Sequence, residues 1–146
     1  MITVALCGTM MLGAVGCGAA EEPAVRERRK VIIDSDTGGD DAAAILVALS
    51  EDSVDVLGIT VLAGNVNIDQ AAANALMTVE IAGKETPVYK GAQTNLAGTE
   101  HETFSIFGED GMGDQNLIHP SREPEPQNAI DFIIETVETN PGEVEL

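Results

Sequence analysis

Four aspartates within eight positions, between a short apolar run and an apolar helix pattern, most constrain the fold of this chain. Val31 to Ile33 predict a short buried strand, and Asp41 to Ser50 predict a helix. Turns that lead from a strand to a helix line the crevice in which open α/β sheets bind ligands. We therefore expect a ligand site at residues 34–41, called the Asp turn below. Its carboxylates are Asp34, Asp36, Asp40 and Asp41.

The carboxylates of the Asp turn need compensating positive charge, because like charges this close repel each other. The dipole of the predicted helix would stabilise Asp40 and Asp41 by only about 0.3–1 kcal/mol each at exposed sites. A bound divalent cation would reduce the repulsion between the carboxylates more strongly. Ligation by carboxylates alone favours Ca²⁺ or Mg²⁺ over Zn²⁺. Helix capping alone would explain Asp40 and Asp41, but it does not explain Asp34 and Asp36.

The composition excludes several classes of partner. The chain has 146 residues, enough for one domain, and 25 acids against 7 bases give a formal net charge of −18. This acidity argues against nucleic acid or an anionic membrane surface as the main partner. Three Phe, one Tyr and no Trp do not make a stacking platform for bases. The apolar content of 44% is enough for a globular core.

The N-terminal segment predicts export. Residues 1–16 carry no charge and are mostly apolar or small, which is typical of a secretory signal and short of the about 20 residues of a membrane span. The run Ala14-Val15-Gly16-Cys17 resembles a bacterial lipobox, which implies lipidation of Cys17 and anchoring in the cell envelope. Ala14 stands where Leu is usual, so secretion or a periplasmic location, and a cytosolic protein with a misassigned start, stay open. With Cys7 also here, the mature domain would hold no disulfide.

The remaining chain alternates between strand and helix patterns. We expect a signal peptide at 1–17, a solvated basic linker at 18–29 and one domain at 30–146. A long segment at 90–126, rich in Gly and Pro, is predicted to be irregular and either functional or disordered. The alternation predicts an open, mostly parallel α/β sheet with flanking helices. Its further strands are predicted at 54–61, 87–89 and 143–146, and its further helices at 68–82 and 127–139.

Two of these helices carry an apolar face, and the face of the first helix is expected to pack against the sheet. The chain stops at the start of the fourth predicted strand, so we expect a fragment of a larger domain. A half-sheet of this kind would leave a central strand edge and apolar helix faces uncovered. The two predicted faces are Ala44, Ile45, Val47, Ala48 and Leu49, and Ala129, Ile130, Ile133, Ile134 and Val137.

Two known kinds of acidic turn agree only in part with residues 34–41. An EF-hand loop has Asp or Asn at its fifth position and Glu at its twelfth, where this chain has Gly38 and Ile45, and it follows a helix. A haloacid-dehalogenase-type phosphatase resembles the turn up to Asp36. Its pattern continues Gly-Thr where this chain has Thr37-Gly38, and it has no need of the second carboxylate pair.

The whole turn, Asp34-Ser35-Asp36-Thr37-Gly38-Gly39-Asp40-Asp41-Ala42, resembles the D-x-D-P-G-x-D-D-A signature of the inosine–uridine-preferring nucleoside hydrolases. Two later stretches agree in order. Thr60-Val61-Leu62-Ala63-Gly64-Asn65 resembles the exit of the family's second strand, and Gly108-Glu109-Asp110-Gly111-Met112-Gly113 resembles its glycine-rich loop. The resemblance covers about residues 30–146. It implies a Rossmann-like nucleoside hydrolase fold, one Ca²⁺, and hydrolysis of a ribonucleoside to free base and ribose.

The resemblance also implies a role for each matching residue. Asp36 would be a Ca²⁺ ligand and the base that takes a proton from the attacking water, and Asp41 would be a second, bidentate ligand. Asp40 would hold the ribose hydroxyls, Asn65 would orient the water or the sugar, and Asp34 would be a supporting carboxylate. Independently of the family, a divalent cation lowers the pKa of bound water. Clustered carboxylates also suit a sugar that becomes cationic during glycoside cleavage.

The chain departs from the family pattern in three respects. Thr37 stands where Pro is usual, and Phe107 stands where many members have His, which leaves base preference open. His101 and His119 lie in the same segment and are interpreted as exposed loop residues. The family domain is much longer, and its second half supplies further metal ligands, ribose contacts and a His that helps the base leave. We therefore expect either a hydrolase or an inactive fragment that needs a complementing half, with homo-oligomer formation left open.

Overall fold

The computed structural model describes residues 27–99, 103, 105–115 and 117–146. The predicted signal segment with Cys17, the linker up to residue 26, and His101 lie outside the described residues, so export and lipidation stay predictions. In the part of the chain that is described, no helix is long and apolar enough to cross a membrane.

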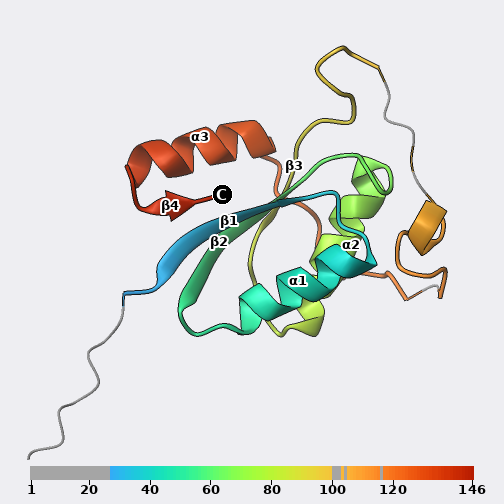
Figure 1. Cartoon of the computed structure of the whole chain (residues 1–146), viewed down its shortest axis with the longest axis horizontal. Helices are drawn as coiled ribbons and strands as arrows, with labels where there is room; N and C mark the ends of the chain where they lie inside the picture. Colours follow the sequence, from blue (N-terminus) through green and yellow to red (C-terminus); the bar gives the residue numbers. More distant parts are fainter. Residues whose placement is uncertain (1–26, 100–102, 104, 116) are drawn as a thin grey trace, which may run out of the picture.

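Strands and helices alternate along the chain, as predicted, around one parallel sheet (Figure 1). The strand order is β3-β2-β1-β4, with every neighbouring pair parallel. The expected open α/β architecture is therefore confirmed. The elements are β1 (Arg29–Ser35), α1 (Gly39–Ser50), β2 (Val54–Val61), α2 (Ile68–Ile81), β3 (Val88–Lys90), the 3₁₀ helix η1 (Ser105–Phe107), α3 (Ala129–Thr139) and β4 (Val144–Glu145).

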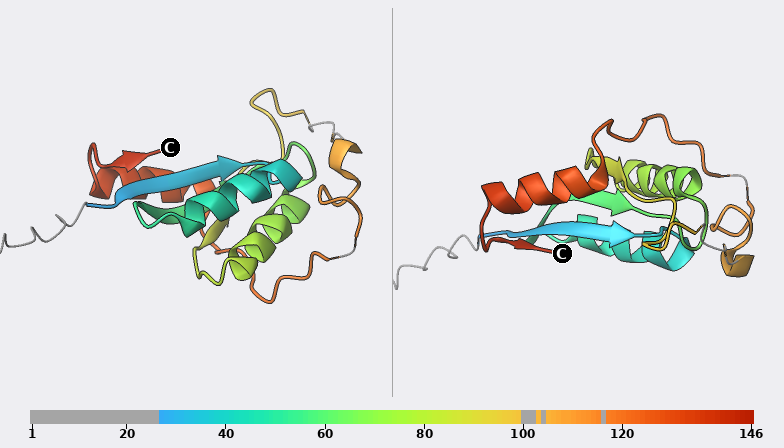
Figure 2. Two further views of the ribbon diagram at one scale, coloured as in Figure 1. Left: turned by 60° about the horizontal axis from the view of Figure 1, so that its bottom comes forward. Right: turned by 90° about the horizontal axis from the view of Figure 1, so that it is seen from above.

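The sheet separates two layers of helices, with α1 and α2 on one face and α3 on the other (Figure 2). Successive residues of a strand point to opposite faces, so β2 serves both layers. Ile59 and Val61 are buried against α1 and α2, and Gly58 faces α3. The main core therefore lies between the sheet and the first two helices. It comprises Ile45, Leu49, Ile59, Val61, Val66, Ala71, Ala72, Ala75, Leu76, Val79 and Val88.

Helix α3 packs on its face of the sheet through an aromatic pair. The Phe132 ring stacks on Tyr89 of β3, with ring centroids 3.9 Å apart and an interplanar angle of 12°. A side chain at Gly58 would meet the Phe132 ring at 2.6 Å, so the glycine makes room for this stack.

The predicted apolar face of α3 is largely exposed to solvent. Ile130, Ile134 and Val137 are 58%, 51% and 45% exposed, because the Phe132 stack turns their side of the helix away from the sheet. Val47 of α1 is also exposed, whereas Ile45 and Leu49 pack in the core as predicted. The exposed stripe on α3 agrees with the expectation of an uncovered apolar helix face.

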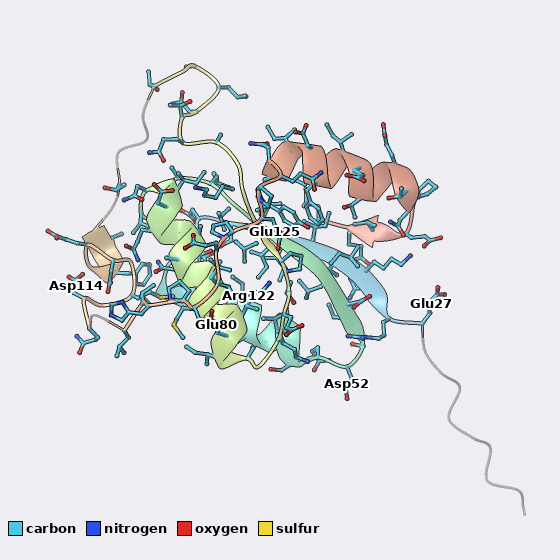
Figure 3. All side chains as sticks on the ribbon, turned by 180° about the vertical axis from the view of Figure 1, so that it is seen from behind. Glu27, Asp52, Glu80, Asp114, Arg122 and Glu125 are labelled. Carbon is cyan, nitrogen blue, oxygen red and sulfur yellow. The ribbon has the colours of Figure 1, made fainter. Side chains whose placement is uncertain are left out.

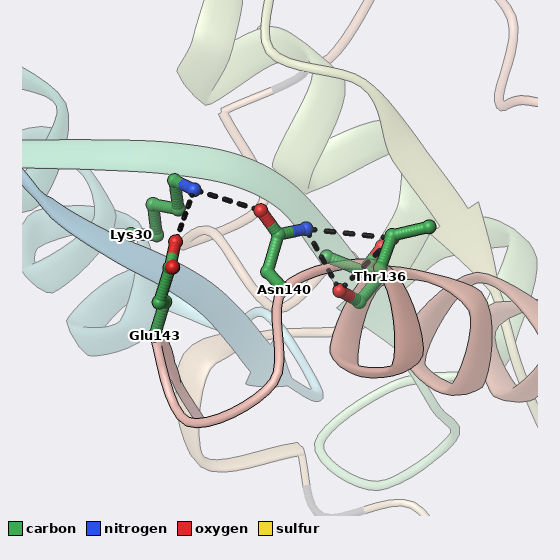
Figure 4. A network of polar contacts seen from close by, with 5 residues as sticks. Lys30, Thr136, Asn140 and Glu143 are labelled. Carbon is green, nitrogen blue, oxygen red and sulfur yellow. Dashed lines mark hydrogen bonds and ion pairs between the residues drawn. The ribbon is translucent and has the colours of Figure 1, made fainter.

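Basic residues at the amino end of β1 are paired with acids of the neighbouring segments. Arg29 begins β1 and forms a bidentate ion pair with Glu145 of β4, which lowers the pKa of that carboxyl. Lys30 Nζ donates to Glu143 Oε2 and Asn140 Oδ1, both at 2.7 Å (Figure 4). Arg28 lies 3.7 Å from Asp55 of β2. These contacts join β1 to its two neighbours at one end of the sheet.

The end of the long segment at 90–126 is tied to α2 and β3. Glu80 Oε1 accepts hydrogen bonds from the Ser121 N–H at 2.8 Å, the Ser121 hydroxyl at 3.0 Å and the Arg122 N–H at 3.1 Å. The Glu125 N–H then donates to Val88 O at 2.8 Å. Figure 3 labels Glu80 and Arg122, which the last of these Glu80 bonds joins, and Glu125 further along the segment. These hydrogen bonds therefore hold residues 121–125 against α2 and the edge strand β3 before α3 begins.

Candidate active site

The Asp turn lies at the carboxyl edge of the sheet, as the sequence predicts. Asp34 lies next to the last residue of β1, Asp36 follows the strand, and Asp40 and Asp41 are in the first turn of α1. Asn65 follows β2, the strand beside β1. Because parallel strands end at the same edge, the two segments meet there.

Asn65 contacts two of the predicted site carboxylates at once. Its backbone N–H donates to Asp36 Oδ2 at 2.7 Å, and its side-chain Nδ2 donates to Asp41 Oδ2 at 3.3 Å. Asp41 Oδ2 also accepts the Gly38 N–H at 2.9 Å, which caps α1. Among the described residues, the Oδ1 atoms of Asp36 and Asp41 accept no hydrogen bond. Each carboxylate is thus oriented through one oxygen and retains the other for a ligand.

The other two aspartates lie outside this cluster. Asp34 pairs with Thr60 in the β1–β2 register, and its Oδ1 accepts the Thr60 hydroxyl at 2.6 Å. Asp40 is exposed on the first turn of α1. The structure therefore joins Asp36, Asp41 and Asn65, and places Asp34 and Asp40 beside them.

The donor set of the site fits a hard divalent cation in part. Carboxylate oxygens are the ligands that Ca²⁺ prefers, and it takes about six to eight of them. Asp36 and Asp41 can supply some of that number. Within the described ranges, no group of three or more His, Cys, Asp or Glu side chains has a metal-binding arrangement. These residues therefore fit one side of a cation shell.

Gly64 leaves the space that the Asp36 side chain occupies, and the sequence analysis did not identify Gly64 as a site residue. A Cβ on Gly64 would overlap Asp36 Oδ2 and would lie 2.7 Å from the Cβ and Cγ of Asp36. The side chain of Asp36 therefore rests directly on the backbone of the β2 exit. A glycine beside Asn65 is the only sequence signal for this contact.

Asn74 is a second site residue that sequence reasoning missed. It is fully buried in α2, and its Nδ2 donates to Thr37 O and Asp110 O, both at 2.9 Å. Thr37 is fully buried as well and bonds through its N–H and hydroxyl to the Ser35 hydroxyl. The available signal was a polar residue at a position of α2 where helical spacing predicts core.

Residues 107–114, called the glycine segment below, form one wall of a pocket beside the Asp turn. The Phe107 ring lies 3.4 Å from where a Cβ on Gly38 would be and 3.8 Å from that of Gly39. Hydrogen bonds from the N–H groups of Asp114 and Met112 hold the segment's turn and keep the pKa of Asp110 below its usual value. The pocket is lined by Gly39, Ile106, Phe107, Gly108, Gly111, Met112, Gly113 and Asp114.

The histidine interpretation is confirmed where the structure describes it. His119 is exposed, and it is not among the residues that line the pocket at the glycine segment. Phe107 therefore provides the ring nearest the Asp turn in that pocket.

Comparison with known proteins agrees with the resemblance of the Asp turn. Residues 31–146 match the model of the inosine-uridine preferring nucleoside hydrolase family. The chain is 39% identical over 124 residues to probable uridine nucleosidase 2 of Arabidopsis thaliana, a match that covers 83% of this chain and 38% of that protein. It is 35% identical over 121 residues to the pyrimidine-specific ribonucleoside hydrolase RihB of Escherichia coli, covering 82% and 38%.

Solved structures give the same result for the fold. The plant nucleoside hydrolase PpNRh1 superposes with a TM-score of 0.74 and 40% identity, over 80% of this chain and 37% of that one. The chain thus spans about 38% of the length of the curated relatives it matches. The family match extends over most of the sequence and includes every element of the sheet except the first two residues of β1. The chain therefore belongs to the inosine-uridine preferring nucleoside hydrolase family.

Proposed function

We propose that the Asp turn and Asn65 form part of a Ca²⁺-dependent site that hydrolyses the N-glycosidic bond of ribonucleosides. The observation that carries this proposal is that Asn65, in the segment after β2, donates to both Asp36 and Asp41 of the Asp turn. Two of the relatives, probable uridine nucleosidase 2 and the pyrimidine-specific ribonucleoside hydrolase RihB, are named for nucleoside substrates, and this supports the substrate class.

The roles of the residues are those that the family resemblance implies, and the places of the residues at the sheet edge support them. When bound, Ca²⁺ would lower the pKa of a coordinated water. Asp36 would be a ligand and would accept the proton of the attacking water, while Asn65 fixes its carboxylate through the 2.7 Å bond. Asp41 would be the second ligand, and the exposed Asp40 would bind ribose hydroxyls. The negative charge of Asp34 and Asp40 would favour the cationic sugar of the transition state.

Calorimetric titration of Ca²⁺ into the 146-residue chain tests this site. We expect binding heat in the native chain and its loss in the Asp36→Asn/Asp41→Asn double variant, because the substitutions remove charge with little change of shape. Asp52→Asn is the matched control, since Asp52 is an exposed aspartate between α1 and β2, far from Asp114 and the glycine segment in Figure 3. Equal heats in all three proteins would contradict the proposed cation site.

We further propose that the 146-residue chain alone does not turn over nucleosides. Two carboxylates fall well short of the about six to eight oxygens that Ca²⁺ takes, and the chain spans about 38% of the length of its relatives. Incubation with uridine and with inosine in Ca²⁺, followed by chromatography of the released base, tests this. We expect no base above that of the Asp36→Asn variant. Release that depends on Asp36 would show instead that these residues are sufficient.

A further inference from the structure

We infer that Asn74 is a positioning residue that holds the glycine segment against the Asp turn. Asn74 lies in the middle of α2, among the small and apolar residues of the main core. Burying an amide in such surroundings is costly unless its polar atoms are hydrogen-bonded. Its side chain is fully buried, so the reason for a polar residue here must lie in its contacts.

Every polar atom of the Asn74 side chain has a partner. Both hydrogens of Nδ2 are used, since it donates to Thr37 O and to Asp110 O at 2.9 Å each. Its Oδ1 accepts from Gln70 Nε2 at 3.0 Å, one turn earlier in α2. Because both loop partners are carbonyl oxygens, only this orientation of the amide satisfies them. An apolar or acidic side chain of the same shape could make neither bond.

The two carbonyl groups belong to the two segments that form the pocket. Thr37 lies between Asp36 and the residues that begin α1, and Asp110 lies at the tip of the glycine segment. A Cβ on Gly111 would lie 2.9 Å from Val66 Cγ1 and 3.3 Å from Asn74 Nδ2. The backbone at 110–111 is therefore seated directly on the side chains of Asn74 in α2 and Val66 in the loop after β2.

This seating fixes the wall of the site. The glycine segment is closed by its own bonds, including Gly113 N–H to Phe107 O at 2.6 Å, so a displacement at Asp110 would carry Phe107 with it. Phe107 packs at Gly38 and Gly39, beside the Asp turn. Asn74 thus sets the distance between the carboxylates and the aromatic wall, although it is buried behind both. An effect of Asn74 on Ca²⁺ binding rests on the proposed function, whereas the contact between Asn74 and the glycine segment does not.

Nuclear magnetic resonance of the 146-residue chain tests the contact directly. In the native chain we expect nuclear Overhauser cross-peaks between the Gly111 α-protons and the Val66 methyl groups. Asn74→Leu and Asn74→Asp keep the size of the side chain and remove both donors, so we expect these cross-peaks to fall at least about threefold as the segment moves off α2. Thr78→Val is the matched control, because the buried Thr78 hydroxyl bonds only to Asn74 O within α2.

Cross-peaks that persist in both Asn74 variants, or that fall equally in Thr78→Val, would overturn the inference. If neither Asn74 variant folds, hydrogen exchange of side-chain amide protons in the native chain tests the contact instead. The Asn74 side-chain amide protons should then exchange far more slowly than those of the exposed Asn95, and equal rates would refute a closed contact.

The calcium affinity supplies a readout that core packing alone would not change. We expect the Ca²⁺ dissociation constant to rise about tenfold in Asn74→Leu, as for other residues that orient metal ligands, and to stay unchanged in Thr78→Val. An unchanged constant in Asn74→Leu would refute positioning of the Asp turn. If the native chain binds no Ca²⁺, the proposed function fails, and the cross-peaks still decide the role of Asn74.

Discussion

Replacing Gly64 with alanine is expected to abolish Ca²⁺ binding and to destabilise the chain. The new Cβ would overlap Asp36 Oδ2 and lie 2.7 Å from two carbons of the same side chain. Asp36 would have to rotate away and lose its bond from the Asn65 N–H. Overpacking of a buried position costs about 1–3 kcal/mol. Urea denaturation and calorimetric titration with Ca²⁺ measure the two effects.

Gly83→Ala separates the two effects, because it is destabilising without touching the site. Gly83 has a φ of +65°, which favours glycine, and no atom lies within 4 Å of its Cβ position. An alanine there costs about 1–2 kcal/mol through the backbone alone, so this variant should lose stability and keep its calcium affinity. Native calcium affinity in Gly64→Ala would mean that Asp36 does not need its observed position.

Replacing Gly58 with alanine is expected to displace α3 and to lower the free energy of unfolding by about 1–3 kcal/mol. The added Cβ would lie 2.6 Å from Phe132 Cζ, 2.8 Å from Phe132 Cε1 and 3.0 Å from Tyr89 Cε2. Both rings of the stack would have to shift. Equilibrium denaturation in urea measures the lowered free energy of unfolding. Titration with Ca²⁺ is the reference measurement, because the Asp turn at the carboxyl edge of the sheet should be unaffected.

A double-mutant cycle with Phe132→Leu tests the cause of this loss. Leucine has no atoms at the positions of Phe132 Cζ and Cε1, so the Gly58→Ala substitution should cost clearly less in that background. The coupling free energy between the two sites should therefore be favourable. The same cost of Gly58→Ala in both backgrounds would show that the aromatic stack is not what the alanine disturbs.

The hydrophobic pattern predicted the sheet and the main core, because these features depend on local periodicity. The strand at 54–61 has the predicted bounds, and α2 ends within one residue of its predicted end. The Asp turn was predicted to be a ligand site because strand-to-helix turns line the crevice of an open α/β sheet, whereas Asn65 was assigned to the site only through the family resemblance. Here local pattern and tertiary structure agree.

The orientation of α3 and the inner contacts of the site could not be predicted in the same way. Ile130 and Ile134 have the spacing of a buried face, but the stacking of Phe132 on Tyr89 decides which side faces the sheet. Asn74 and Gly64 act through backbone groups of segments far away in the sequence. Such contacts depend on atomic distances, which residue type and spacing do not encode.

The ion pairs at the amino end of β1 neutralise charge only at that end of the sheet. Three of its seven basic residues, Arg28, Arg29 and Lys30, are held there by acids of β2, β4 and the turn before β4. The Asp turn lies at the opposite end of the strand, roughly 20 Å away for a strand of this length, well beyond the screening length of about 8 Å in physiological salt. Those cations cannot offset its charge, so the turn should attract mobile cations from solution, and their rate of arrival should fall as ionic strength rises.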